Sequence, residues 1–151
     1  MDQGEKWSWE FWGFESPTEG RPVQDWFDDL PGEAKDEIID LVRYLRLRTN
    51  SRWQRPEFDP LRGSCGISEL RTDRIRVERG GLCEEATYRM YGYFGPGEHA
   101  YTLLDGTKKE QTNDRPGKQI ACERLRQIKL GAATCHRFRF KSRSDLSTKE
   151  E

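Results

Sequence analysis

The stretch 86-ATYRMYGYF-94, followed by 99-HAYTLL-104, decides the fold. Both runs are rich in aromatic and other strand-forming residues, and 95-GPGE-98 between them has the glycines and proline of a tight turn. Before them, 66-GISELR-71 indicates a strand that could extend through Ile75 and Val77 to a turn at Gly80-Gly81. Strands joined by such short turns pair antiparallel. The centre of the chain therefore predicts an antiparallel sheet.

Helices are expected on either side of this sheet in the sequence. Residues 7–15 indicate an aromatic-rich strand, 23–30 a short helix and 33–48 a stronger helix with an apolar face. After the sheet, a helix is expected to end at Gly131, and 137-RFRFK-141 is either an edge strand or a basic arm. The order predicts an α+β fold: a small twisted antiparallel sheet with an N-terminal helical pair and a C-terminal helix, all packed on one side.

Length and composition indicate a single domain. We expect residues 1–141 to form it and the polar segment 142–151 to be a disordered tail. No apolar run approaches the ~18 residues of a membrane span, and the first ten residues lack a secretory signal pattern. We therefore expect a cytoplasmic protein with no membrane partner.

The cysteines Cys65, Cys83, Cys122 and Cys135 are widely spaced and form no CxxC pair. Structural metal sites usually have closely spaced ligand pairs. The spacing therefore predicts reduced, mostly buried thiols and no metal site.

The net charge of −1 conceals an asymmetry along the chain. Residues 1–61 hold 8 Lys and Arg against 14 Asp and Glu, whereas residues 62–143 hold 17 against 10. A basic second half is expected of a domain with one surface facing a polyanion, although charged runs are also common on ordinary solvated faces. Within it, 105-DGTKKEQT-112 is by itself either a solvated turn or a phosphate-handling segment.

Four segments together resemble one family. They are 15-ESPTEGRPVQDWFDDLP-31, 66-GISELR-71, 88-YRMYGYF-94 and 103-LLDGTKKEQT-112. In this order they are similar to the phage-derived, HigB-like toxin family of the RelE/ParE superfamily, over roughly residues 7–130. The resemblance implies a RelE-like fold and a bacterial or phage origin.

The resemblance also implies an activity and partners. Many such toxins enter the ribosome and cut messenger RNA, using the ribose 2′-hydroxyl as nucleophile, without a cofactor. A toxin of this kind is neutralised by a cognate antitoxin, here expected to carry a helix-turn-helix domain. The reaction needs a base, an acid for the leaving oxygen and cations for the charged transition state.

Carried over to this sequence, the resemblance points to a catalytic set of Arg71, Arg89, Lys108 and Lys109. One of the two lysines would act as the leaving-group acid, and Arg89 would contact phosphate. Arg71 and Arg89 could equally form cross-strand pairs with Glu69. Further RNA-binding candidates are Arg62, Arg74, Arg115, Lys118, Arg137 and Arg139.

The sequence departs from the best-known family members in two places. Ile67 and Glu69 stand where those toxins carry lysines, and 110-EQTNDRP-116 lacks a tyrosine that some of them use. The general base is therefore open among Glu69, Tyr91 and Tyr93. Two other functions stay open: a non-catalytic inhibitor such as a ParE-like toxin acting on gyrase, and an RNA- or partner-binding module without activity.

Overall fold

The computed structural model describes residues 9–48, 53–61, 63, 65–109 and 115–141, without the side chains of Arg79 and Lys109. The expected tail at 142–151, the first residues of the expected strand at 7–15 and Arg62 lie outside these ranges. The elements in chain order are β1 Glu10–Glu15, α1 Pro22–Asp28, α2 Gly32–Arg46, β2 Phe58–Pro60, β3 Ser68–Arg71, β4 Ile75–Arg79, β5 Leu82–Phe94, β6 Ala100–Lys109, α3 Arg115–Lys129 and β7 Thr134–Arg137.

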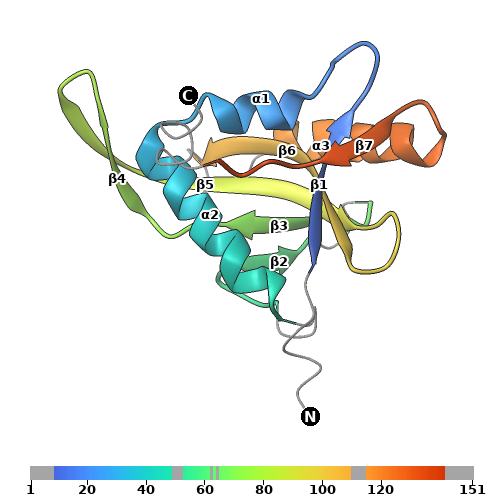
Figure 1. The fold of residues 1–151 in the computed structure, drawn as a ribbon, viewed down its shortest axis with the longest axis horizontal. Coiled ribbons are helices and arrows are strands. Elements are labelled where there is room, and N and C mark those ends of the chain that lie inside the picture. Colours follow the sequence, from blue (N-terminus) through green and yellow to red (C-terminus); the bar gives the residue numbers. More distant parts are fainter. Residues whose placement is uncertain (1–8, 49–52, 62, 64, 110–114, 142–151) are drawn as a thin grey trace, which may run out of the picture.

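The described strands form one twisted, mixed sheet in the order β2-β3-β5-β6-β1-β7, with β4 paired to the outer part of β5. The β4–β5 hairpin projects from the body, and α2 crosses in front of the strands (Figure 1). The α+β class, the N-terminal helical pair and the C-terminal helix are confirmed. Most pairings are antiparallel as expected, but β1 pairs parallel with β6.

The long strand β5 lies at the centre and pairs with β3 on one side and β6 on the other. Its alternating side chains reach two separate cores. Tyr88 and Met90 belong to the larger core beneath α1 and α2, which also holds the buried Trp53. Tyr91 belongs to a smaller core with Ala121 and Leu125 of α3.

The expectation that all helices pack on one side is therefore wrong, because α3 covers the opposite face of the sheet from α1 and α2. Both faces of β5 carry apolar residues, and this is the pattern that a strand covered on both sides requires.

The prediction of four reduced, mostly buried thiols is wrong for two of the four, and none of the four cysteines is fully buried. Cys65, in the segment before β3, forms a disulfide with Cys122 of α3, and the two residues are 57 positions apart in the sequence. Cys83 is a free, exposed thiol and Cys135 a free, half-buried one. A pairing over this distance has no local signal in the sequence, since it depends on α3 lying on this face of the sheet.

Candidate functional site

The candidate catalytic residues that the family resemblance indicated lie on three adjacent strands, β3, β5 and β6. In the register of the sheet, Arg71 of β3 lies opposite Arg89 of β5, and Arg89 lies opposite Thr107 of β6. Residues directly opposite one another share a face of the sheet. Arg71 and Arg89 therefore lie on the face that α3 partly covers, next to the cross-strand pair of Glu69 and Tyr91.

Arg89 is the centre of a buried polar cluster, which we call the Arg89 cluster: Glu69, Arg89 and Tyr91. The Nε of Arg89 lies 3.5 Å from a carboxylate oxygen of Glu69, and its Nη1 donates a hydrogen bond of 3.0 Å to the Tyr91 hydroxyl. Arg89 is 2% exposed, Glu69 5% and Tyr91 0%. The cross-strand pair with Glu69 is thus present, and a guanidinium held this way is fixed in orientation before any ligand arrives.

Lys108 does not share this face. It lies opposite Tyr88, on the side of α1 and α2, and its ammonium forms an ion pair of 2.9 Å with Glu84. The backbone of Lys109 lies opposite Thr87. Strand β6 continues through both lysines, so the segment 105–109 is part of the sheet and not a turn.

Among the three candidate bases, Tyr93 is the least suited. Burial is the main cause that raises the pKa of Tyr93 to about 12. A phenol with this pKa stays protonated at neutral pH and does not accept a proton readily. Glu69 is a carboxylate already in contact with Arg89, so it offers a base and a cation side by side.

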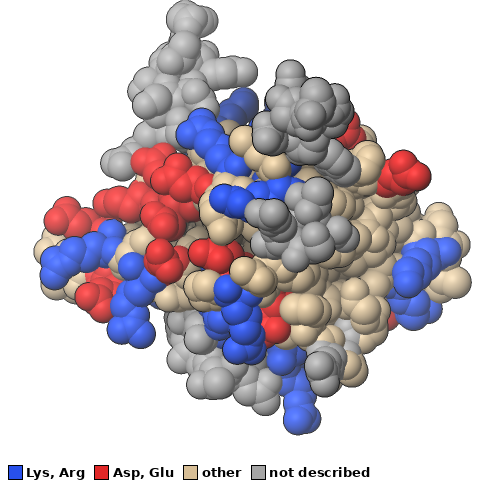
Figure 2. All heavy atoms as spheres, turned by 90° about the horizontal axis from the view of Figure 1, so that it is seen from below, with Lys and Arg blue, Asp and Glu red and all other residues tan. Residues whose placement is uncertain are grey.

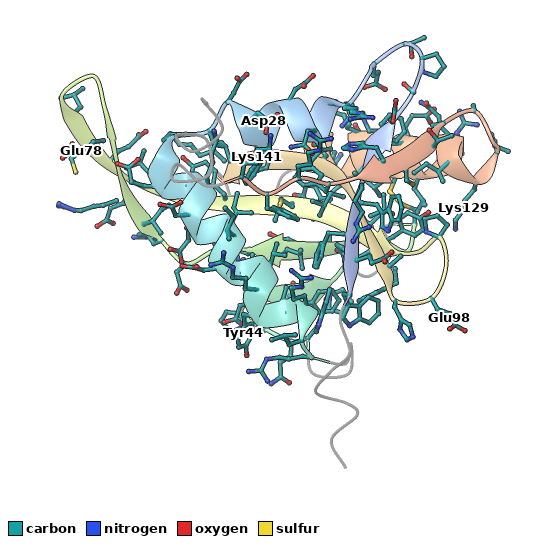
Figure 3. All side chains as sticks on the ribbon, viewed as in Figure 1. Asp28, Tyr44, Glu78, Glu98, Lys129 and Lys141 are labelled. Atoms are coloured by element: carbon teal, nitrogen blue, oxygen red, sulfur yellow. A yellow bond between two sulfur atoms is a disulfide. The ribbon has the colours of Figure 1, made fainter. Side chains whose placement is uncertain are left out.

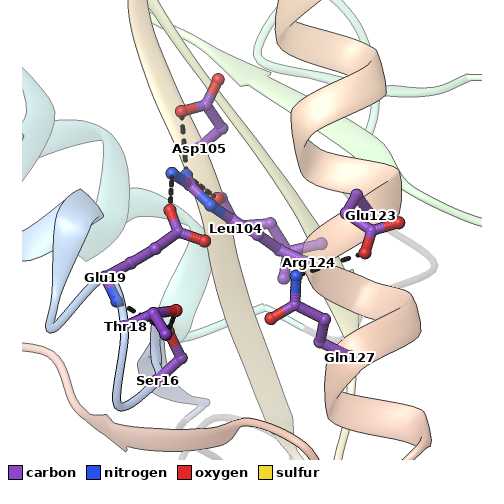
Figure 4. Close-up of polar contacts among 8 residues, drawn as sticks. All are labelled: Ser16, Thr18, Glu19, Leu104, Asp105, Glu123, Arg124 and Gln127. Atoms are coloured by element: carbon purple, nitrogen blue, oxygen red, sulfur yellow. Dashed lines mark hydrogen bonds and ion pairs between the residues drawn. The ribbon is translucent and has the colours of Figure 1, made fainter.

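Arg124 of α3 is a site residue that the sequence reasoning missed. Its guanidinium donates hydrogen bonds to the Leu104 carbonyl at 2.8 Å, to Asp105 at 3.2 Å and to Glu19 at 2.7 Å (Figure 4). Asp105 lies opposite Tyr91 in the sheet. Arg124 thus fixes α3 to β6 at the border of the Arg89 cluster.

The described RNA-binding candidates, which exclude Arg62, do not form one surface. Arg74 pairs with Glu85 at 3.5 Å on the β4–β5 hairpin, and Arg137 lies 4.0 Å from Glu10 on the β7 edge. Arg115 and Lys118 line a pocket on α3, whereas Arg139 lines a different pocket beside α1. Figure 2 shows basic side chains interspersed with acidic ones on the face it presents, without one continuous basic patch.

The described residues contain no group of three or more His, Cys, Asp or Glu side chains arranged to hold a metal ion. In the same ranges, none of the helices has the length and apolar character of a membrane-spanning segment.

Comparison with known proteins gives one family. The model of a family described as phage-derived protein Gp49-like matches residues 25–126, which is more than half of the chain and includes β3, β5 and β6. A comparison with curated proteins finds no match.

Proposed function

Because the chain belongs to the phage-derived Gp49-like family, a family of RelE-like toxins, we propose that it is the toxin of a type II toxin–antitoxin pair. We further propose that it belongs to the HigB-like group and cuts messenger RNA on the ribosome. The observation that carries the proposal is the Arg89 cluster, since it joins a carboxylate, a guanidinium and a phenol on the central strands of the matched region.

Cleavage would proceed by attack of a ribose 2′-hydroxyl on the adjacent phosphate, giving a 2′,3′-cyclic phosphate and a free 5′-hydroxyl. In this proposal Glu69 takes the proton of the attacking hydroxyl. Arg89 and Arg71 stabilise the extra negative charge on the phosphorane-like transition state, because a guanidinium matches the geometry of phosphate oxygens. Lys109 would protonate the leaving 5′-oxygen, a role that rests on the family resemblance alone.

The burial of the Arg89 cluster suggests why such a toxin would depend on the ribosome. Arg89 and Glu69 are nearly inaccessible to solvent and bound to each other, so free RNA in solution has little access to either group. We propose that docking on the ribosome separates the pair and exposes both groups. Breaking a buried ion pair is costly unless new partners replace it, and the RNA phosphate would be such a partner for Arg89.

The partners follow from the same proposal. A toxin of this family requires a cognate antitoxin, and we propose one with a helix-turn-helix domain, encoded beside the toxin and acting in the bacterial cytoplasm. Co-expression with the neighbouring gene product should then restore growth.

The proposal is tested by induced expression of the protein and of Glu69→Gln, with the 5′ ends of cellular messages mapped. We expect growth arrest and new 5′ ends within translated regions for the unaltered protein. Glu69→Gln keeps the side-chain volume and removes the base, so cleavage should fall by about 10²–10⁴-fold, the usual contribution of a general base.

Arg43→Gln on the exposed part of α2 is the control and should cleave normally. Equal cleavage by Glu69→Gln, in protein of unchanged melting temperature, would remove Glu69 from the mechanism.

A non-catalytic function has one observation in its favour. Arg89 is already engaged by Glu69 and Tyr91, and Lys108 by Glu84, so both could be purely structural. A gyrase inhibitor would then trigger a DNA-damage response on induction, and an inactive RNA- or partner-binding module would bind ribosomes or RNA, in either case without producing new message ends.

A further inference from the structure

The Cys65–Cys122 disulfide lies in the wall of a pocket of about 710 Å³ on α3. Cys65 is exposed, whereas Cys122 is half-buried against the smaller core. Cys65 is therefore the more accessible residue of the pair, and Cys122 is held by the helix.

The rest of this pocket, which we call the α3 pocket, is strongly basic. Arg115, Lys118, Arg126 and Lys129 line it together with the two cysteines. Among the described residues of the lining, Glu123 is the one acidic residue, and it is already paired with Arg126 at 2.7 Å. The pocket therefore has an excess of positive charge around the disulfide. Figure 3 shows Lys129 at the far end of α3.

Lys118 and Arg126 are four residues before and after Cys122 in the helix, so all three lie on one helical face. Cations close to a sulfur stabilise its thiolate form, and a stabilised thiolate leaves faster in thiol–disulfide exchange. Cys122 is thus placed as a good leaving group and Cys65 as the accessible point of attack.

We propose that the α3 pocket is a thiol–disulfide exchange site for a small anionic thiol. In the first step the thiolate of that molecule attacks Cys65 Sγ, a mixed disulfide forms, and the Cys65–Cys122 bond breaks with Cys122 leaving as a thiolate. In the second step another thiolate attacks the outer sulfur of the mixed disulfide and Cys65 leaves as a thiolate. Two small thiols are oxidised to one small disulfide, and the two electrons reduce the protein.

The exchange would act on the elements beside the Arg89 cluster. The disulfide ties the segment leading into β3, which carries Glu69 and Arg71, to α3, which carries Arg124. Cys65 also has a φ of 51°, in the left-handed region that residues other than glycine rarely adopt. Opening the bond frees Cys65 to leave this conformation. In a reducing cytoplasm such a disulfide is expected to be transient and regulatory.

The experiment uses the full chain with Cys83→Ser and Cys135→Ser, so that any thiol adduct detected comes from the Cys65–Cys122 pair. The oxidised protein is treated with glutathione, which is anionic, or cysteamine, which is cationic. Samples are quenched with acid at intervals and analysed by intact mass and peptide mapping. Each rate is divided by the rate of the same thiol with a small neutral disulfide, which removes differences in intrinsic reactivity.

We expect the normalised rate with glutathione to exceed that with cysteamine by about tenfold or more, since a pocket lined by one sign of charge raises the local concentration of an oppositely charged molecule by about 10–10³. The glutathione adduct should map to Cys65. Lys118→Gln with Lys129→Gln should remove most of this preference, while the matched control Arg43→Gln with Arg46→Gln on α2 should retain it.

Equal normalised rates for the two thiols would overturn the proposal. An adduct on Cys122 alone, or an equal loss of preference in the α3 and α2 variants, would also overturn it. None of these results depends on RNA cleavage, so the exchange site and the proposed ribonuclease function can fail independently.

Discussion

Gly106 of β6 is a position where the close packing of the sheet against α1 can be tested by mutation. A Cβ placed on Gly106 would overlap with ring atoms of Trp26 in α1, well inside the 3.0 Å that real Cβ contacts keep. Trp26 packs against the larger core, so its ring has little freedom to withdraw. The absence of a side chain at Gly106 is therefore what lets α1 lie against β6.

We expect Gly106→Ala to lower the free energy of unfolding by about 1–3 kcal/mol, the usual penalty of overpacking. Trp26→Phe removes the overlapping ring atoms and should rescue part of this loss. Urea denaturation of the two single variants and the double variant measures the coupling. Strict additivity of the two effects would contradict the contact as the cause.

The Arg89 cluster shows how far residue-level reasoning from sequence reaches. The family motif placed Arg71 and Arg89 together, and the register confirms that they are neighbours, although their catalytic role stays a prediction. Arg124 was missed because its hydrogen-bond partners Glu19 and Asp105 are 105 and 19 residues away. The available signal was an arginine between the buried Ala121 and Leu125, at a position where a helix facing a core normally carries an apolar residue.

At the scale of elements, local patterns predicted the strands and helices well, but not how distant ones pair. The helix expected at 33–48 is α2, and the strand expected at 86–94 is the inner part of β5. The parallel pairing of β1 with β6 brings together segments about ninety residues apart, and its register, such as Glu10 opposite Ala100, has no local signature. The face of the sheet on which α3 packs depends on which face α1 and α2 leave uncovered. This too is a property of the tertiary structure and not of the local sequence.

The disulfide joins the segment before β3 covalently to α3. It should therefore stabilise the fold measurably. Closing a loop over 57 positions of sequence separation removes unfolded-state entropy equivalent to about 4 kcal/mol in the chain-entropy model. We expect reduction, or Cys65→Ser with Cys122→Ser, to lower the free energy of unfolding by up to that amount.

Guanidinium denaturation with and without a reductant measures this loss, with Cys83→Ser and Cys135→Ser as the control pair. The control protein should show the same dependence on reductant as the unaltered chain. A denaturation midpoint that reductant does not change would mean that the link contributes no stability.

At the scale of the whole molecule, the described basic residues of the second half of the sequence do not gather on one face. Arg115 and Lys118 lie in the α3 pocket, whereas Arg139 lines a pocket beside α1 together with Asp28 and Lys141. These pockets lie on opposite faces of the sheet, and Figure 3 shows Asp28 and Lys141 near α1, well away from Lys129. The charge asymmetry along the chain thus predicted an excess of basic side chains in the second half, but not the surfaces on which these side chains lie.

A short single-stranded RNA is therefore expected to contact one of these two groups and not both. If the proposed function is correct, the RNA contact lies on the α3 side, because the Arg89 cluster is on that face.

Removing two basic side chains that contact phosphates should reduce the slope of log affinity against log salt by about 1.4, since each phosphate on a single strand contributes about 0.7. We expect this reduction for Arg115→Gln with Lys118→Gln, and an unchanged slope for Arg139→Gln with Lys141→Gln, two basic residues of the pocket beside α1 that do not line the α3 pocket. Fluorescence anisotropy with a labelled RNA of about twelve nucleotides, titrated at several salt concentrations, measures both slopes. A reduced slope for the Arg139 and Lys141 pair alone would place the RNA on the side of α1, away from the Arg89 cluster, and would favour a binding function over cleavage.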